Sequence, residues 1–79
     1  MNITEYIISK IHDFTGLKEK EIEVESEIQS IGLNSVSFVG LVLDIENKYN
    51  FEFDDDKLSS ESFLRVSDLI LYVSTKTNE

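Results

Sequence analysis

A serine follows a tight glycine turn in the stretch IGLNSVSF, residues 31–38. Ser35 can cap the helix that begins here, because a serine oxygen accepts hydrogen bonds from the free N–H groups of a first turn. Asn34 is an equally good cap and lies one residue earlier. If Asn34 holds the cap, the Ser35 hydroxyl is free where the N–H groups and dipole of a helix N-terminus favour a phosphate. Ser35 would then be a natural attachment point for a phosphoryl-linked group.

The other residues that could do chemistry form weaker patterns. His12 is the one histidine, and beside Asp13 we expect it on the surface. The run Asp54–Asp56 suggests calcium, but it lacks the spacing and the glycine of an EF-hand loop, although Glu61 follows. No Gly-x-Ser-x-Gly elbow or phosphate-binding glycine loop occurs. The sequence therefore predicts neither an enzyme active site nor a metal site.

The composition is that of a small acidic chain. Its 79 residues include 16 acidic and 7 basic side chains, which gives a net charge of -9. Nucleic acids and anionic membranes bind clustered Lys and Arg, so neither is expected as a partner, whereas basic protein surfaces are favoured. The length predicts a single domain over residues 1–79 with a modest core. No cysteine, secretory start or long apolar run occurs, which predicts a cytoplasmic location.

Apolar residues at steps of three and four predict three helices. The first covers Ile3–Phe14, the second covers Val36–Tyr49, and the third begins at about Asp68. A single short helical turn is expected within Leu58–Leu64. At least one of the two rings in the stretch FEF, residues 51–53, is expected to point inward.

Several residues mark where these helices begin and end. Asn2 or Thr4 is expected to cap the first helix, and Gly16 suits its C-terminus. Ser67 is expected to cap the last helix, with an acid in the first turn. Gly40 inside the second helix costs about 1 kcal/mol relative to Ala. This cost indicates an exposed or closely approached position.

The stretch from Leu17 to Ser30 predicts a long ordered loop. Ile22 and Val24 alternate with glutamates as in a strand, but a lone strand could not satisfy its backbone. We expect these side chains and Ile28 to anchor the loop to the core. The fold class is therefore all-α: a small four-helix bundle of three main helices plus one short helix, with a long loop between helices 1 and 2.

The serine motif, in its place within this pattern, resembles the acyl carrier protein and peptidyl carrier protein family of phosphopantetheine-binding carriers. The family signature is a Gly-x-Asp-Ser turn that opens the second helix, and it appears here as Gly32-Leu33-Asn34-Ser35-Val36. The resemblance covers nearly the whole chain, including the stretches 49–51, 53–55 and 67–70. The motif alone is a weak signal, but within an acidic four-helix pattern of this length it is strong.

The resemblance implies a carrier that catalyses nothing itself. Ser35 would be esterified by 4'-phosphopantetheine, which a phosphopantetheinyl transferase takes from coenzyme A, with Gly32, Leu33, Asn34 and Val36 around the attachment point. The arm would tether acyl, aminoacyl or polyketide intermediates as thioesters, as in fatty acid, polyketide or nonribosomal peptide biosynthesis. Such cargo is sometimes sheltered between the helices.

The resemblance also implies partner enzymes that load and process the cargo, with basic docking surfaces for an acidic, monomeric carrier. The first half of the second helix would form the partner surface, with contacts from Leu33, Val36, Phe38, Asp44 and Glu46. Of Leu33 and Val36, we expect one to contact partners and the other to help the core. Phe38 is expected either in the core or at the docking surface, and Glu46 is alternatively a solvated helix residue.

One position departs from the family pattern, because Asn34 stands where the family usually has Asp. Asn keeps the capping geometry but removes a charge, so loading would be slower or need a dedicated transferase if that Asp helps the transferase bind. The second helix is less uniformly acidic than in fatty-acid carriers, which favours a specialised biosynthetic pathway. Two alternatives stay open: an unmodified acidic helical protein-interaction module, and an ion-binding module centred on Asp54–Asp56.

Overall fold

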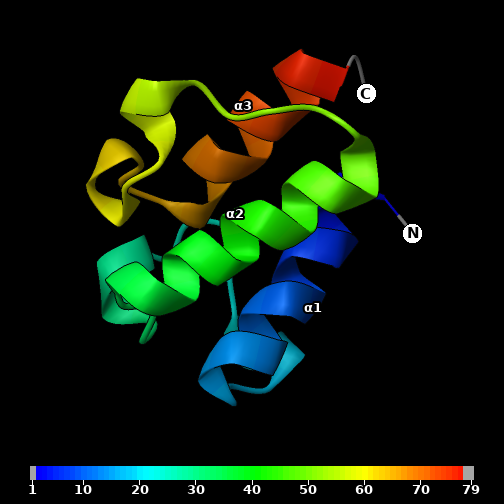
Figure 1. Cartoon of the computed structure of the whole chain (residues 1–79). Coiled ribbons are helices and arrows are strands. Elements are labelled where there is room, and N and C mark those ends of the chain that lie inside the picture. Colours follow the sequence, from blue (N-terminus) through cyan, green and yellow to red (C-terminus); the bar gives the residue numbers. More distant parts are fainter. Residues whose placement is uncertain (1, 78–79) are drawn as a thin grey trace.

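The computed structural model describes residues 2–77, and three α-helices make up most of the fold (Figure 1). The helices are α1 (Ile3–Thr15), α2 (Ser35–Tyr49) and α3 (Val66–Thr77). Four short 3-10 turns lie between them: η1 (Glu19–Glu21), η2 (Ile28–Ser30), η3 (Asp55–Lys57) and η4 (Ser60–Ser62). The predicted all-α fold is confirmed, with η3 and η4 in place of the single short helix. Within the described range, no helix is long and apolar enough to cross a membrane.

Local sequence signals fix both ends of α1. The Asn2 side chain accepts a hydrogen bond from the Glu5 N–H at 2.8 Å, and the Glu5 carboxylate accepts one from the Asn2 N–H. This reciprocal cap resolves the choice between Asn2 and Thr4. Gly16 ends the helix with φ 79° and donates its N–H to the His12 carbonyl, as the sequence predicts.

The core lies where the three helices meet, and each helix contributes one buried stripe. Full burial of a Val, Leu, Ile or Phe side chain stabilises a fold by roughly 1.5–3 kcal/mol. The fully buried helical residues are Ile7 and Ile11 of α1, Phe38, Leu41 and Ile45 of α2, and Val66, Leu69 and Val73 of α3. The apolar pattern along α2 therefore contains a buried stripe and a second stripe that faces outward.

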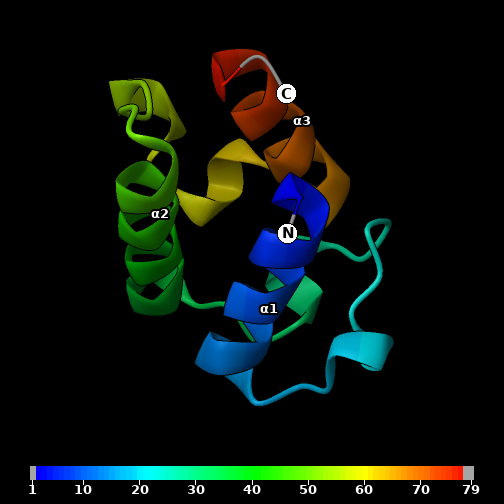
Figure 2. The same ribbon diagram turned by 90° about the vertical axis from the view of Figure 1, so that its right-hand side faces the viewer.

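The chain between α1 and α2 is anchored to the core, as predicted. Ile22 and Ile28 are buried, and Val24 is half-buried. In Figure 2 this segment, coloured cyan, runs along the side of α1 away from α2. The loop therefore covers the side of α1 that faces away from α2.

The same loop pairs part of its backbone with residues 64–67, but no strand forms among the described residues, so the predicted ordered loop is confirmed. An isolated antiparallel bridge joins Glu27 and Arg65. The flanking hydrogen bonds run from Ile28 N–H to the Leu64 carbonyl at 2.9 Å, from Val66 N–H to the Ser26 carbonyl at 3.0 Å, and from Ser67 N–H to the Val24 carbonyl at 2.8 Å. Because the two segments lie far apart in the sequence, no local pattern pointed to this pairing.

This pairing also changes where α3 begins. The sequence predicts Ser67 as the cap, but the helix already includes Val66 and Ser67. Carbonyls of the long loop accept the first N–H groups of α3, which otherwise have no partner in the helix. The Asp68 carboxylate accepts a further hydrogen bond, from the Arg65 N–H at 3.0 Å, so an acid does lie in the first turn.

Candidate attachment site

The open choice at the start of α2 is resolved in favour of Asn34. Its backbone is extended, with φ -85° and ψ 179°, and its side-chain oxygen accepts a hydrogen bond from the Ser37 N–H at 2.8 Å. Ser35 is therefore the first helical residue, and it is exposed. Within residues 2–77 its hydroxyl makes no hydrogen bond, so this oxygen is available for chemistry.

A left-handed turn at Gly32 leads the chain into this helix. Its φ of 87° lies in a region that residues with a Cβ rarely adopt. A Cβ built there would touch only Thr15, at an ordinary 3.9 Å. Glycine is therefore needed at position 32 for its backbone conformation rather than for lack of space for a Cβ.

The two neighbours of Ser35 divide between core and solvent. Leu33 is 3% exposed, whereas Val36 is 82% exposed. Phe38 is completely buried, with its ring centroid 6.1 Å from that of Phe63. Leu33 and Phe38 thus offer no side-chain surface to a partner, and the structure corrects their predicted place among the docking contacts.

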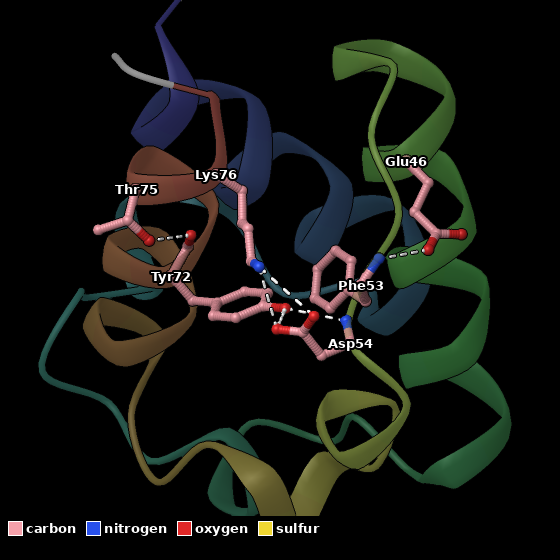
Figure 3. Close-up of polar contacts among 6 residues, drawn as sticks. All are labelled: Glu46, Phe53, Asp54, Tyr72, Thr75 and Lys76. Carbon is pink, nitrogen blue, oxygen red and sulfur yellow. Dashed lines mark hydrogen bonds and ion pairs between the residues drawn. The ribbon is translucent and has the colours of Figure 1, made fainter.

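The two predicted partner-binding acids have partners inside the molecule. Asp44 forms an ion pair with Lys10 of α1 at 3.4 Å, and its charge raises the pKa of that lysine. Glu46 accepts a hydrogen bond from the Phe53 N–H at 2.8 Å and is half-buried (Figure 3). Glu46 is therefore more than a solvated helix residue, because it fixes the chain that follows α2.

That chain is held from its other side by α3. Figure 3 shows Tyr72 and Lys76 converging on Asp54. The Tyr72 hydroxyl donates to the Asp54 carboxylate at 2.7 Å, and the Lys76 amine lies 3.1 Å from it. The hydrogen bond from Tyr72, and then Lys76, lower the pKa of Asp54 below its ordinary value. Sequence reasoning missed this contact, because nothing local to Asp54 points to residues near the C-terminus.

Aromatic stacking accompanies this polar contact. Phe53 is buried, and its ring centroid lies 5.3 Å from that of Phe51 and 5.2 Å from that of Tyr72. The expectation that at least one ring points inward is confirmed. Within the described residues, no group of three or more acids or histidines is placed to hold a metal ion.

His12 has a structural contact rather than the expected surface position. It is half-buried, and its Nδ1 lies 2.6 Å from the Leu17 carbonyl oxygen. Because a carbonyl oxygen only accepts, Nδ1 must carry the proton in this hydrogen bond. His12 thereby closes the turn that follows α1.

A cavity of about 350 Å³ opens beside the middle of α2. Val39 lies on its wall four residues after the serine, which corresponds to about 6 Å of helix rise. Three carboxylates also line it, including that of Glu46. The apolar lining residues are Val39, Val42, Leu43, Phe53 and Leu58.

The residues around Ser35 suit a covalently attached phosphate group. The hydroxyl is exposed at the N-terminus of a 15-residue helix, where backbone N–H groups and the dipole favour negative charge. The side chains from Asn34 to Leu43 carry no charge, so no neighbouring acid on this stretch opposes a phosphate. No carboxylate or imidazole of the described residues is hydrogen-bonded to Ser35.

Comparison with known proteins agrees with this geometry. Residues 5–73 match the sequence profile of a family described as "Phosphopantetheine attachment site". The chain is 30% identical over 77 residues to an acyl carrier protein of Nitratidesulfovibrio vulgaris strain DP4, covering 96% of this chain and 99% of the relative. It is 30% identical to an acyl carrier protein of Clostridium acetobutylicum, covering 87% and 88%, and 25% identical to one of Chlamydia trachomatis, covering 99% and 100%.

The chain therefore belongs to the acyl carrier protein family, whose members carry a covalently attached 4'-phosphopantetheine. Proteins of this family are carriers rather than catalysts, and they work with phosphopantetheinyl transferases and synthase enzymes.

Proposed function

We propose that Ser35 is the residue to which 4'-phosphopantetheine is attached, and that the chain delivers intermediates on this arm to partner enzymes. The observation that carries the proposal is that Asn34, and not Ser35, caps α2. Asn34 satisfies the helix N-terminus, and the exposed Ser35 hydroxyl has no structural task. The serine motif also lies within the matched residues 5–73.

In the loading step, the Ser35 oxygen forms a bond to the phosphorus of the pantetheine phosphate of coenzyme A. The bond from this phosphorus to the bridging diphosphate oxygen breaks, and the adenosine bisphosphate part leaves with the electron pair. The serine proton passes to a base on the transferase. In this step Asn34 orients Ser35 by holding the first turn of α2, and the free N–H groups of that turn face the incoming phosphate.

The arm supplies the thiol on which acyl, aminoacyl or polyketide intermediates are held as thioesters. The apolar side chains of Val39 and Leu43 on the wall of the cavity can shelter the first carbons of such a cargo. The uncharged first half of α2 supports a role in a specialised biosynthetic pathway rather than bulk fatty-acid synthesis. A cytoplasmic monomer with one domain over residues 1–79 completes the proposal.

Intact-protein mass spectrometry after incubation with coenzyme A, magnesium and a broad-specificity phosphopantetheinyl transferase tests the proposal. The wild type should gain the mass of one phosphopantetheine, and Ser35→Ala should gain none. Ser37→Ala is the matched control, because this serine lies two residues away and is half-buried, and it should load like the wild type. A wild type that stays unmodified would instead favour the unmodified interaction module.

A further inference from the structure

The cavity beside the middle of α2 is lined by apolar and acidic side chains, and by no basic one. Valine, leucine and phenylalanine side chains make up its apolar wall. The remaining lining residues are Glu46, Glu52 and Asp55, which we name the cavity acids. Small-molecule sites in proteins combine an apolar wall with a few polar groups that select the ligand, and this cavity has that composition.

The cavity acids have no basic partner within residues 2–77. None of the three takes part in an ion pair of the described residues. The two lysines nearest to them in the sequence lie over aromatic rings instead. The Lys48 amine lies 5.7 Å from the ring centroid of Tyr6, and the Lys57 amine lies 5.9 Å from that of Phe63. The cavity is therefore negatively charged without a cation of its own among the described residues.

Glu46 is the best placed of the cavity acids. It is half-buried, whereas Glu52 and Asp55 are exposed. One of its carboxylate oxygens accepts the Phe53 N–H at 2.8 Å, which holds the group at the cavity wall (Figure 3). The other oxygen makes no hydrogen bond among the described residues. A partly buried charge of this kind attracts a positive group more strongly than a fully solvated charge does.

An arm attached at Ser35 is long enough to bring cargo to Glu46. The two residues lie about three turns apart on α2, which corresponds to about 16 Å of helix rise. About fourteen bonds separate the serine oxygen from the sulfur of a phosphopantetheine arm, and at the reach of an extended chain they span about 16 Å. A group carried on the sulfur can therefore lie at the level of the cavity acids.

We infer that the cavity selects a cargo that bears a protonated amine, so that the acyl group on the arm is an aminoacyl or other amine-bearing group. This inference rests on the proposed function, because it needs the arm on Ser35. The apolar wall would contact the carbons of the cargo, and the ammonium group would donate charge-assisted hydrogen bonds to Glu46 and its neighbours. A plain fatty chain would instead take the Glu46 carboxylate out of water without giving it a partner.

Free probes test the cavity without any loading. The probes n-hexylammonium and n-hexanol have the same carbon chain and differ in charge. In titrations followed by NMR through the methyl signals of Val39 and Leu43, hexylammonium should bind at least about fivefold more tightly than hexanol. Equal dissociation constants, or no shift of these signals with hexylammonium, would overturn the inference.

Matched variants separate the cavity acids from net charge. Glu46→Gln removes one negative charge but keeps an oxygen for the Phe53 N–H, and it should remove most of the preference for hexylammonium. Glu52→Gln, at an exposed position, should remove a smaller part, and thermal melting checks that both variants are folded. Glu61→Gln removes the same charge outside the cavity lining and should keep the preference within about twofold. An equal loss in Glu61→Gln would show that net charge attracts the amine, and this would overturn the inference.

Loaded forms extend the test to the arm. The β-alanyl and butyryl groups have the same length and differ in the terminal amine. Hydroxylamine should cleave the β-alanyl thioester at least about threefold more slowly in the wild type than in Glu46→Gln, and the butyryl thioester equally fast in both. Equal rates for β-alanyl would contradict the selection of an amine even though Ser35 is loaded. Failure to load would reject the attachment proposal, and the binding of the free probes would still decide whether the cavity prefers an amine.

Discussion

The two halves of α2 share a buried face but differ on the outside. In the first half, Val36, Val39 and Leu43 face outward and no side chain is charged. In the second half, Asp44 and Glu46 reach α1 and the chain after α2. One end of the helix is thus fastened to the rest of the molecule, and the other end presents Ser35.

This difference shows that net charge does not tell which acids have partners inside the molecule. The charge of -9 predicts attraction to basic proteins, yet the acids of α2 that seemed suited to partners have internal contacts. Asp44 and Glu46 hold the helix to its neighbours, whereas the stretch of the helix around Ser35 carries no charge.

A cavity in the buried face of α2 should have the largest effect on stability. Phe38→Ala removes a completely buried ring that packs near Phe63, so we expect a loss of about 3–5 kcal/mol of unfolding free energy. The outward-facing Val36→Ala should change stability by less than about 0.5 kcal/mol. Urea unfolding of both variants measures the contrast, and similar losses would mean that the two faces are wrongly assigned.

The hydrogen bond that holds the second half of α2 to the chain after it can be removed by substituting Glu46. Glu46→Ala leaves the Phe53 N–H without its carboxylate, which should cost about 1.5 kcal/mol, as for hydrogen bonds to charged groups. Asn47→Ala, at the next and exposed position, serves as the control. If chemical denaturation finds no difference between the two variants, the Glu46 contact does not stabilise the fold.

The stability of the first half of α2 depends on the Asn34 cap. Asn34→Ala should destabilise the protein by about 1 kcal/mol, whereas Asn34→Asp keeps the cap and adds a charge that the helix dipole favours. Ser35→Ala should leave stability nearly unchanged, because Asn34 holds the cap. Thermal melting of the three variants tests this order, and a loss at Ser35 equal to that at Asn34 would contradict it.

The smallest expected effect concerns pH. The pKa of Asp54 is lowered in the folded state by Tyr72 and Lys76, so its ionised form stabilises the fold above the ordinary pKa of an aspartate. This contribution should be lost as the pH falls from about 5 to about 2. The melting temperature of Asp54→Asn should therefore approach that of the wild type across this range. A constant difference between the two would show that the contact does not depend on charge.

Features set by neighbouring residues could be predicted from the sequence, and features set by distant ones could not. Asn2, Gly16 and Gly40 gave correct local signals, because caps and the close contact of Gly40 with the Phe14 ring leave traces in residue type. The identity of the Asn34 cap needed the structure, because two good capping residues stand side by side. The sequence pointed to Ser35 as a candidate, and the structure shows that its hydroxyl has no hydrogen-bond partner among residues 2–77.

The errors share one physical cause. The start of α3 is set by carbonyls of Ser26 and Val24, which lie far from it in the sequence. The partner of Glu46 is a backbone N–H that periodicity cannot reveal. The phase of the outer stripe of α2 was also ambiguous, because Phe38 and Val39 are both apolar and only packing decides which is buried.

The most direct test of the central claim is to locate the modification on the loaded wild type by fragmentation mass spectrometry. The phosphopantetheine mass should lie on Ser35 and nowhere else, because this hydroxyl is exposed at the start of α2 and has no hydrogen bond of its own among the described residues. A modification found on Ser37, or on any other residue, would contradict the assignment of Ser35.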